Sequence, residues 1–292
     1  MTDYPIRKAV FPVAGLGTRF LPVTKANPKE MLPIVDKPLI QYAVEEALAC
    51  GITELIFVTS QSKRAIENHF DRNFELERVL AERNKQQALQ ELQNILPEEV
   101  SCIYIRQPQP RGLGHAVWCA RNIVGDEPFA LILADVLVAN ERSVCLNDMC
   151  QLFNETQSSV IAVNEVAREA VDQYGIVSVQ ADETSGLLAI NDIVEKPNLD
   201  KAPSNLAVAG RYILTPAIFN YLADMPADHR GEIQLTDAIA RLLQEETVYA
   251  HALTEHLYDC GSKLGYLQAT IDYGLRHPDM AEALRQFLRT RV

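Results

Sequence analysis

The sequence predicts an α/β protein with a doubly wound, mostly parallel sheet, and three observations support this fold class. Short apolar runs of buried-strand type lie at residues 8–13, 55–59, 102–106 and 129–134. Helical patterns lie between these runs, and strands that alternate with helices pair in parallel through right-handed crossovers. The chain has 292 residues, 48% of them hydrophobic, so it is long enough to bury a large core.

The helices of the first half are predicted from their periodicity and their end signals. Residues 39–50 form a helix that ends at Gly51, because glycine commonly follows the last helical turn. Apolar residues recur at helical spacing from Leu76 to Leu96, which predicts one long amphipathic helix that ends near Pro97.

The second half of the chain has a more mixed pattern, which predicts antiparallel additions to the sheet. Its strand-like runs lie at residues 160–166, 176–179, 187–194 and 208–214, and helices follow at 234–244 and 264–275. The amphipathic stretch at residues 280–292 completes a C-terminal helical tail. No repeat or linker interrupts the chain, so we expect a single domain over residues 1–292.

Charge and cysteine content argue against several classes of protein. The net charge of −12 is unsuited to a nucleic-acid surface, which must neutralise phosphates. Residues 1–40 nevertheless hold six Lys and Arg against three Asp and Glu, so a basic pocket for a small polyanion is possible. No run reaches membrane-spanning length, and the first residues lack a secretory pattern. The six cysteines form no C-x-x-C pair, so we expect reduced thiols, no structural zinc and a cytoplasmic location.

A glycine-rich turn, VAGLGTRFLP at residues 13–22, follows the first predicted strand. It is not a dinucleotide fingerprint, because Phe20 stands where G-x-G-x-x-G requires its third glycine, and it is not a Walker loop. Its backbone N–H groups can still face an anion, with Arg19 and Lys29 close by in sequence. Since ligands of open α/β sheets bind beyond the carboxyl ends of the strands, this turn is a candidate anion site.

A series of motifs extends this candidate over nearly the whole chain. The series begins with AGLGTRFLPVTKANPKEMLPIVDKPLIQY at residues 14–42. It continues with ENHFD (67–71), GLGHAV (112–117), VEKP (194–197), APSNLAVAGRYIL (202–214), EIQLTDAI (232–239) and DCGSKLGYLQA (259–269). In content and order these motifs resemble the sugar-1-phosphate nucleotidyltransferases, and within that family the branch that transfers uridylyl groups.

The resemblance implies a Rossmann-like nucleotidyltransferase fold and a specific reaction. Glucose 1-phosphate and UTP would give UDP-glucose and pyrophosphate with the help of Mg²⁺, through in-line attack of the sugar phosphate on the α-phosphorus. Both reactants are anions and a phosphate needs no general base, so positioning and charge neutralisation should dominate. Residues 1–140 would bind the nucleotide, residues 141–260 the sugar phosphate, and helices in 261–292 would be a possible oligomer interface.

The catalytic and metal-binding residues follow from the same resemblance. Arg19 and Lys29 match positions that stabilise the leaving pyrophosphate. The planar guanidinium of Arg19 and the flexible ammonium of Lys29 both suit phosphates. Asp135 follows an apolar run, where a carboxylate can hold Mg²⁺ against substrate phosphates; a turn aspartate is the alternative without the family match. Asp259 matches a family aspartate that helps hold metal, and a structural turn is again the alternative.

The two substrate subsites complete the prediction. For the nucleoside and its phosphates the resemblance implies the first loop, with Glu30, Gln107 and Gly112. An amide such as that of Gln107 offers uracil both a donor and an acceptor, and an exposed loop residue is the alternative. For the sugar phosphate it implies the glycine in QYGIV and the Glu-Lys pair in VEKP. The loop residues are Ala14, Gly15, Leu16, Gly17 and Thr18, and the sugar residues are Gly175, Glu195 and Lys196.

Two other functions remain open from the sequence. The first is a thymidylyltransferase, whose nucleotide carries thymine, a base that differs from uracil by one methyl group. Discrimination by one methyl group is typically worth only about 1–3 kcal/mol. The motifs AGLGTR and PKEMLP resemble the uridylyl branch. A non-catalytic paralogue that modulates an active partner is the second alternative, and retention of Thr18, Arg19, Lys29, Asp135 and Lys196 argues against it. Relatives form dimers or tetramers, so we expect a homodimer or homotetramer. We expect no nucleic-acid or membrane partner.

Overall fold

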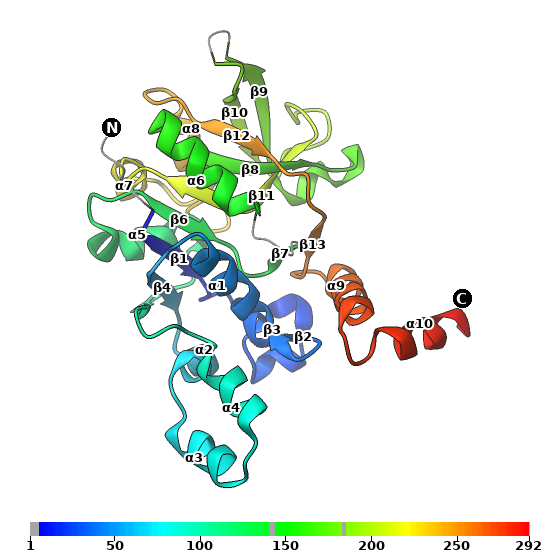
Figure 1. The fold of residues 1–292 in the computed structure, drawn as a ribbon. Helices are drawn as coiled ribbons and strands as arrows, with labels where there is room; N and C mark the ends of the chain where they lie inside the picture. The colour runs from blue at the N-terminus through cyan, green and yellow to red at the C-terminus, as the bar shows by residue number, and fades with distance from the viewer. Residues whose placement is uncertain (1–5, 140–143, 183–184, 292) are drawn as a thin grey trace.

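A single mixed sheet organises the chain (Figure 1). The computed structural model describes residues 6–139, 144–182 and 185–291, and within these ranges nine strands form this sheet in the order β5-β4-β1-β6-β11-β8-β12-β10-β9. The predicted segment bounds at residues 1, 140, 141 and 292 lie outside the described ranges. The four strands of the first half pair in parallel: β5 (Ser101–Arg106), β4 (Glu54–Thr59), β1 (Lys8–Pro12) and β6 (Phe129–Ile132).

Strand β11 (Leu206–Leu214) joins the two halves, because it pairs antiparallel with β6 on one side and with β8 (Val160–Glu165) on the other. Beyond it lie β12 (Tyr249–Ala252), β10 (Leu188–Glu195) and β9 (Gly175–Ala181). The pairing of β10 with β9 is antiparallel, while β12 runs parallel to β8. The predicted α/β class, with antiparallel additions after the first half, is therefore confirmed.

Two small antiparallel pairs lie outside the main sheet. The first pairs β2 (Pro33–Ile34) with β3 (Lys37–Pro38), and the second pairs β7 (Val136–Val138) with β13 (Leu257–Asp259). The second pair brings a segment near the C-terminus beside the turn that follows β6.

Helices cover both faces of the sheet, as a doubly wound fold requires. The prediction of one helix from Leu76 to Leu96 is wrong: the chain forms α3 and α4 instead, separated where Asn84 adopts a left-handed conformation with φ of 55°. The α-helices are α1 (Leu39–Ala49), α2 (Arg64–Phe70), α3 (Phe74–Glu82), α4 (Gln86–Gln93), α5 (Gly112–Val124), α6 (Val144–Thr156), α7 (Ile218–Ala223), α8 (Leu235–Leu242), α9 (Lys263–Arg276) and α10 (Ala281–Arg289).

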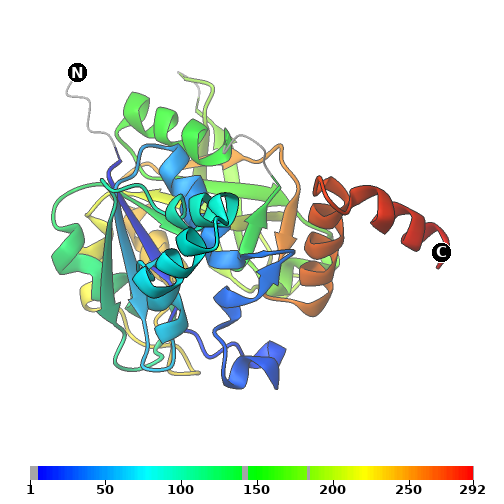
Figure 2. The ribbon, with the colours of Figure 1, turned by 60° about the horizontal axis from the view of Figure 1, so that its bottom comes forward.

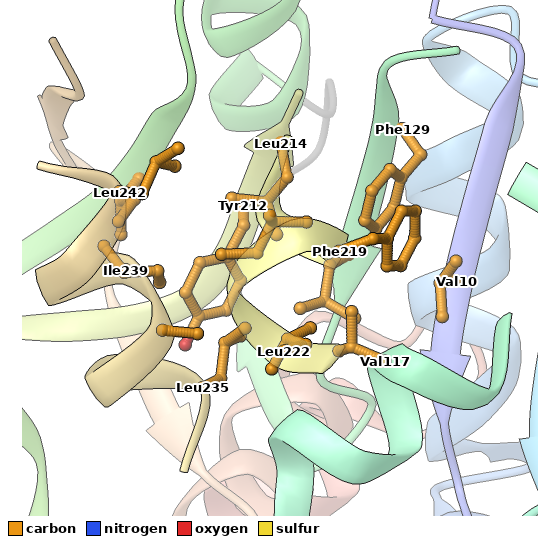
Figure 3. Packing of buried hydrophobic residues seen from close by; sticks show 14 of the residues in the cluster. Val10, Val117, Phe129, Tyr212, Leu214, Phe219, Leu222, Leu235, Ile239 and Leu242 are labelled. Atoms are coloured by element: carbon orange, nitrogen blue, oxygen red, sulfur yellow. The ribbon is translucent and has the colours of Figure 1, made fainter. Parts of the chain in front are cut away.

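The core consists of two apolar layers, one on each face of the sheet. Alternate residues of β1 serve the two layers, with Val10 on one side and Phe11 on the other, because successive strand side chains point to opposite faces. Figure 3 shows the layer under α5, α7 and α8, where the rings of Phe129 and Phe219 stack at 5.4 Å between centroids. Helices α1, α2 and α6 cover the opposite layer. Strands buried in this way explain the contiguous apolar runs in the sequence.

The C-terminal helices extend away from the sheet (Figures 1 and 2). Helix α9 contacts β2 and β13, while α10 packs on α9 and reaches outward. Residues Leu264, Leu267 and Ile271, spaced at three and four on α9, are exposed, and so is Phe287 of α10. Within the described ranges, no helix has the length and apolar character to cross a membrane.

Candidate active site

A cleft of about 1140 Å³ opens at the carboxyl ends of β1, β5 and β6 and runs toward β9 and β10. Both halves of the chain line it, which agrees with the general position of ligand sites in open α/β sheets. The cleft brings together every site residue expected from the sequence except Glu30: Ala14, Gly15, Leu16, Gly17, Thr18, Arg19, Lys29, Gln107, Gly112, Asp135, Gly175, Glu195, Lys196 and Asp259.

The glycine-rich turn forms one end of the cleft. Within the described ranges, the backbone N–H groups of residues 15–18 form no hydrogen bond to the protein, so they remain free to donate to a ligand. Gly17 has a φ of 65°, a conformation that favours glycine, and its carbonyl accepts a hydrogen bond of 2.7 Å from the hydroxyl of Thr24. The turn therefore presents unpaired backbone donors in a concave arrangement that suits an anion.

Charged side chains converge beside this turn. The Lys29 Nζ atom lies 2.5 Å from the Asp135 Oδ2 atom, and both side chains are about 25% exposed. The β7/β13 pair sets Asp259 directly opposite Val136, next to Asp135. A Cβ atom placed on Gly261 would lie 2.9 Å from Asp259 Oδ1, 3.0 Å from Asp135 Oδ2 and 3.4 Å from Arg19 Nη1. Two carboxylates and a guanidinium thus surround a space that only glycine leaves open.

The pKa values of the two carboxylates are shifted in opposite directions by burial and by neighbouring charges. Burial acts to raise the pKa of Asp135, but the Lys29 ammonium outweighs it, with help from Arg19, and the pKa is lowered. For Asp259, burial raises the pKa and the charge of Asp135 raises it further. A cation between the two carboxylates would relieve this repulsion.

The carboxylates fit a magnesium ion of the kind that binds with substrate. Mg²⁺ prefers oxygen ligands and is commonly held by one or two carboxylates together with phosphates and water. In the described part of the chain, no group of three or more His, Cys, Asp or Glu side chains is placed to hold a metal alone. Asp135 and Asp259, with the open space beside Gly261, suit an ion that completes its coordination with a bound phosphate.

Glu30 does not lie in the cleft, so the expectation that it orients the nucleoside is not supported by its position. Its side chain is 2% exposed and its Oε2 atom accepts a hydrogen bond of 2.8 Å from the buried Lys63 Nζ. Burial raises the pKa of Glu30, while Lys63 and Lys29 act to lower it. Because Glu30 follows Lys29 directly, its buried pair with Lys63 fixes the segment that presents Lys29 to the cleft.

Gln107 stands at the mouth of β5, on the other side of the glycine-rich turn. Its backbone N–H donates to the Thr59 carbonyl at 2.8 Å, which continues the pairing of β5 with β4 by one residue. Its side chain reaches the first turn of α5, where Nε2 donates to the Gly112 carbonyl at 3.1 Å. Two of the residues expected to bind the nucleotide, Gln107 and Gly112, are therefore in direct contact.

The far end of the cleft is formed by the first residue of β9 and the last residues of β10. Gly175 lies directly opposite Glu195 in this pair, and a Cβ atom on Gly175 would come within 2.9 Å of Thr236 Cγ2. Glu195 Oε2 accepts a hydrogen bond of 3.2 Å from the Thr236 hydroxyl, and its Oε1 pairs with the Lys196 ammonium. Thr236 was not predicted as a site residue from the sequence, although it lies within the EIQLTDAI motif at residues 232–239.

A buried arginine behind Asp135 was also missed. Arg211 of β11 is 1% exposed, and its Nε and Nη2 atoms donate to both carboxylate oxygens of Glu46 on α1 at 2.8–3.0 Å. Its Nη1 and Nη2 atoms also donate to the carbonyls of Leu133 and Val136, at 3.1 and 2.9 Å. Arg211 therefore holds the turn that carries Asp135 from both sides. The charge inside an apolar strand was the signal available in the sequence.

Replacing Glu46 by alanine is expected to destabilise the protein by about 3–5 kcal/mol, because the buried Arg211 guanidinium would lose its counter-charge. The free energy of unfolding, from urea titration followed by circular dichroism, measures this loss. Glu45→Ala is the matched control: its carboxylate is 41% exposed and pairs with Lys37 on the surface, so about 0–1 kcal/mol is expected. Equal losses in the two variants would contradict a bracing role for Arg211.

Comparison with known protein families gives one match over most of the chain. The nucleotidyl transferase family pattern matches residues 8–274, which include every cleft residue named above.

Comparison with individual proteins gives closely similar relatives. UTP-glucose-1-phosphate uridylyltransferase of Haemophilus influenzae is 50% identical over 288 residues, which cover 97% of this chain and 98% of that protein. A UTP-bound UGPase from Acinetobacter baumannii has a TM-score of 0.89 at 49% identity, and covers 97% of this chain and 98% of its own. A UDP-glucose pyrophosphorylase complexed with UDP-glucose has a TM-score of 0.84 at 45% identity, and covers 93% of this chain and 100% of its own.

Proposed function

Because this chain belongs to the nucleotidyl transferase family, we propose that its cleft transfers a uridylyl group from UTP to glucose 1-phosphate, giving UDP-glucose and pyrophosphate. The observation that carries the proposal is the content of one continuous cleft, with a glycine-rich turn and Arg19 at one end and the Glu195–Lys196 pair at the other. The relatives named for this reaction, and those solved with UTP or UDP-glucose, support it at 45–50% identity.

The reaction proposed is an in-line displacement. A phosphate oxygen of the sugar forms a bond to the α-phosphorus of UTP, and the bond from that phosphorus to the bridging oxygen of pyrophosphate breaks. The donors in this chain hold both anions in line and neutralise the charge that builds up on the leaving group. The free N–H groups of residues 15–18 would hold the triphosphate, and Arg19 and Lys29 would stabilise the pyrophosphate as it leaves.

The sugar phosphate would occupy the end of the cleft near β9 and β10. The Glu195 carboxylate can accept hydrogen bonds from sugar hydroxyls, and the Thr236 hydroxyl fixes its orientation. The adjacent Lys196 ammonium can neutralise the phosphate of the sugar. Lys196 has a φ of 44°, and its N–H donates to the Tyr174 carbonyl at 2.9 Å, so the backbone at this point is fixed.

The uracil base would lie against residues Ala14 and Gly15, between the turn and Gln107. The Gln107 amide nitrogen already donates to the Gly112 carbonyl, so its oxygen is the atom that can accept a hydrogen bond from the imide N–H of uracil. Mg²⁺, held by Asp135 and Asp259, would supply charge stabilisation on the phosphates. A cytoplasmic location is part of the proposal, since all six cysteines are free thiols, as suits a reducing compartment.

The proposal is tested by measuring pyrophosphate release from the purified protein with glucose 1-phosphate, Mg²⁺ and each nucleoside triphosphate in turn. We expect release with UTP to be the fastest. Faster release with dTTP would assign the protein to thymidylyl transfer. A lack of release with every nucleotide would favour a non-catalytic role.

Replacing Gly175 by alanine is expected to raise the KM for glucose 1-phosphate with little change in the KM for UTP. The added methyl group would meet Thr236 Cγ2 at 2.9 Å and Glu195 Oε2 at 3.4 Å, so the residues of the sugar end must shift. Initial rates at varied concentrations of each substrate measure the two constants. Gly186→Ala is a control, since its Cβ would meet nothing within 4 Å; its φ of 73° adds only local strain in a remote turn. Equal increases in both KM values for Gly175→Ala would contradict a sugar-specific role.

We further propose that the protein is a homodimer or homotetramer that uses the C-terminal helices. The exposed residues Leu264, Leu267 and Ile271 lie on one side of α9, which is typical of a surface covered by a partner. Sedimentation velocity of the full chain is expected to show a dimer or tetramer, and Leu267→Glu is expected to shift it toward the monomer. A wild-type monomer at micromolar concentration would contradict the proposal.

A further inference from the structure

The amide of Gln107 has a fixed orientation. The residue is 8% exposed, its Nε2 group donates to the Gly112 carbonyl at 3.1 Å, and the same group lies 3.1 Å from the Nδ1 atom of His115. In the described part of the chain, no protein group donates a hydrogen bond to the Oε1 atom. The donor side of the amide is therefore engaged with α5, and the acceptor side is left for a ligand in the cleft.

The Gly112 carbonyl anchors this orientation, because a carbonyl oxygen can only accept hydrogen bonds. Gly112 itself is held at the start of α5. It has a φ of 88°, and a Cβ atom there would lie 2.8 Å from the Ile233 carbonyl oxygen. The backbone around it is tied to residue 233 on both sides, through Gly114 N–H to Ile233 O at 2.9 Å and Ile233 N–H to Arg111 O at 2.7 Å.

His115 is placed to complete the orientation, because its Nδ1 atom lies where it can accept the second amide hydrogen. This requires a neutral ring with its proton on Nε2, the atom that faces Cys119 Sγ at 4.0 Å. Burial lowers the pKa of His115 and the Arg111 guanidinium lowers it further, while the Gln109 carbonyl acts in the opposite direction. The surroundings of the ring thus favour its neutral form.

We propose that His115 is a specificity-determining positioning residue: by holding the Gln107 amide with Oε1 toward the cleft, it selects bases that carry a hydrogen at N3. The inference rests on the proposed function and deepens its base subsite. Uracil carries an N3–H donor that can pair with Oε1. Cytosine has an acceptor at N3, so its lone pair would face the lone pairs of Oε1 and the two atoms would repel each other. Thymine has the same N3–H as uracil, so this device rejects cytosine and does not distinguish uracil from thymine.

The test compares the Kd values of UTP, dTTP and CTP, measured by calorimetry in the presence of Mg²⁺, in the wild type and two variants. His115→Phe keeps a planar ring but removes the acceptor, and is expected to lower the preference for UTP over CTP about 3- to 10-fold. The ratio of UTP to dTTP is expected to stay unchanged. His115→Asn places an amide oxygen where Nδ1 lies, and is expected to keep most of the preference for UTP over CTP.

A second histidine provides the matched control. His69 on α2 also contacts a glutamine side chain, Gln41 Oε1 at 3.0 Å, but lies outside the cleft, so His69→Phe is expected to change neither ratio. The inference is overturned if the wild type binds UTP and CTP equally, if His115→Phe keeps the full preference, or if it shifts both ratios together as a general distortion would. Selective binding that His115→Phe weakens, without any pyrophosphate release by the wild type, would support the inference and contradict the proposed reaction.

Discussion

Asp135→Asn is expected to lower the rate of UDP-glucose formation by about 1000-fold or more at saturating substrates and Mg²⁺. The substitution keeps the shape of the side chain but removes the charge that would hold the metal ion against the phosphates. In the unsubstituted protein the Lys29 ammonium lies 2.5 Å from Asp135 Oδ2, and the substitution removes the negative charge that pairs with it. Because the free N–H groups of residues 15–18 and Lys29 remain, the Kd of UTP should change far less than the rate.

A comparison with a remote aspartate separates this loss from a general effect of charge. Asp224 follows α7, is exposed and does not line the cleft, so Asp224→Asn is expected to turn over at the wild-type rate. Thermal unfolding of both variants checks that they fold. Turnover of Asp135→Asn within about tenfold of the wild type would remove this residue from the metal site.

Arg19→Ala is expected to lower kcat by about 100-fold while leaving the order of preference among UTP, dTTP and CTP unchanged. The guanidinium lies at the phosphate end of the cleft, where its Nη1 atom is 3.5 Å from the Gly261 carbonyl, and Gln107 lies across the turn. In the proposed reaction its charge would therefore act on the leaving pyrophosphate and not on the base. Steady-state rates with each nucleotide measure both quantities.

The conservative variant provides the control for Arg19. Arg19→Lys keeps a positive charge but loses the planar fork, so it is expected to fall between the wild type and Arg19→Ala. The side chain is exposed, which means that neither variant should lower the unfolding temperature appreciably. An Arg19→Ala variant with altered base preference and a normal rate would reverse the division of roles between Arg19 and Gln107.

Much of the fold was predictable because buried strands are encoded locally. The runs at residues 8–13, 55–59, 102–106 and 129–134 correspond to β1, β4, β5 and β6 within two residues at each end. A parallel strand covered on both faces needs a contiguous apolar run, and the sequence contains these runs. The break between α3 and α4 was missed because it depends on the left-handed conformation of Asn84, which the helical spacing of the leucines on both sides concealed.

The site was predictable to the extent that its residues occupy sequence motifs, and contacts between distant segments were not. Fourteen of the fifteen expected positions line the cleft, and the exception is Glu30, whose buried partner Lys63 lies 33 residues away. The pair of Arg211 and Glu46 spans 165 residues. A charge in an apolar strand indicates that a buried partner exists, but only the folded chain identifies which residue it is.

The most direct test of the account follows the phosphorus atoms of UTP through the reaction. UTP labelled at the α-phosphorus, or separately at the γ-phosphorus, is incubated with the protein, glucose 1-phosphate and Mg²⁺, and the products are separated. The account predicts that the α label appears in UDP-glucose and the γ label in pyrophosphate. Release of the γ label as orthophosphate, or the absence of labelled UDP-glucose, would contradict attack at the α-phosphorus by the sugar phosphate.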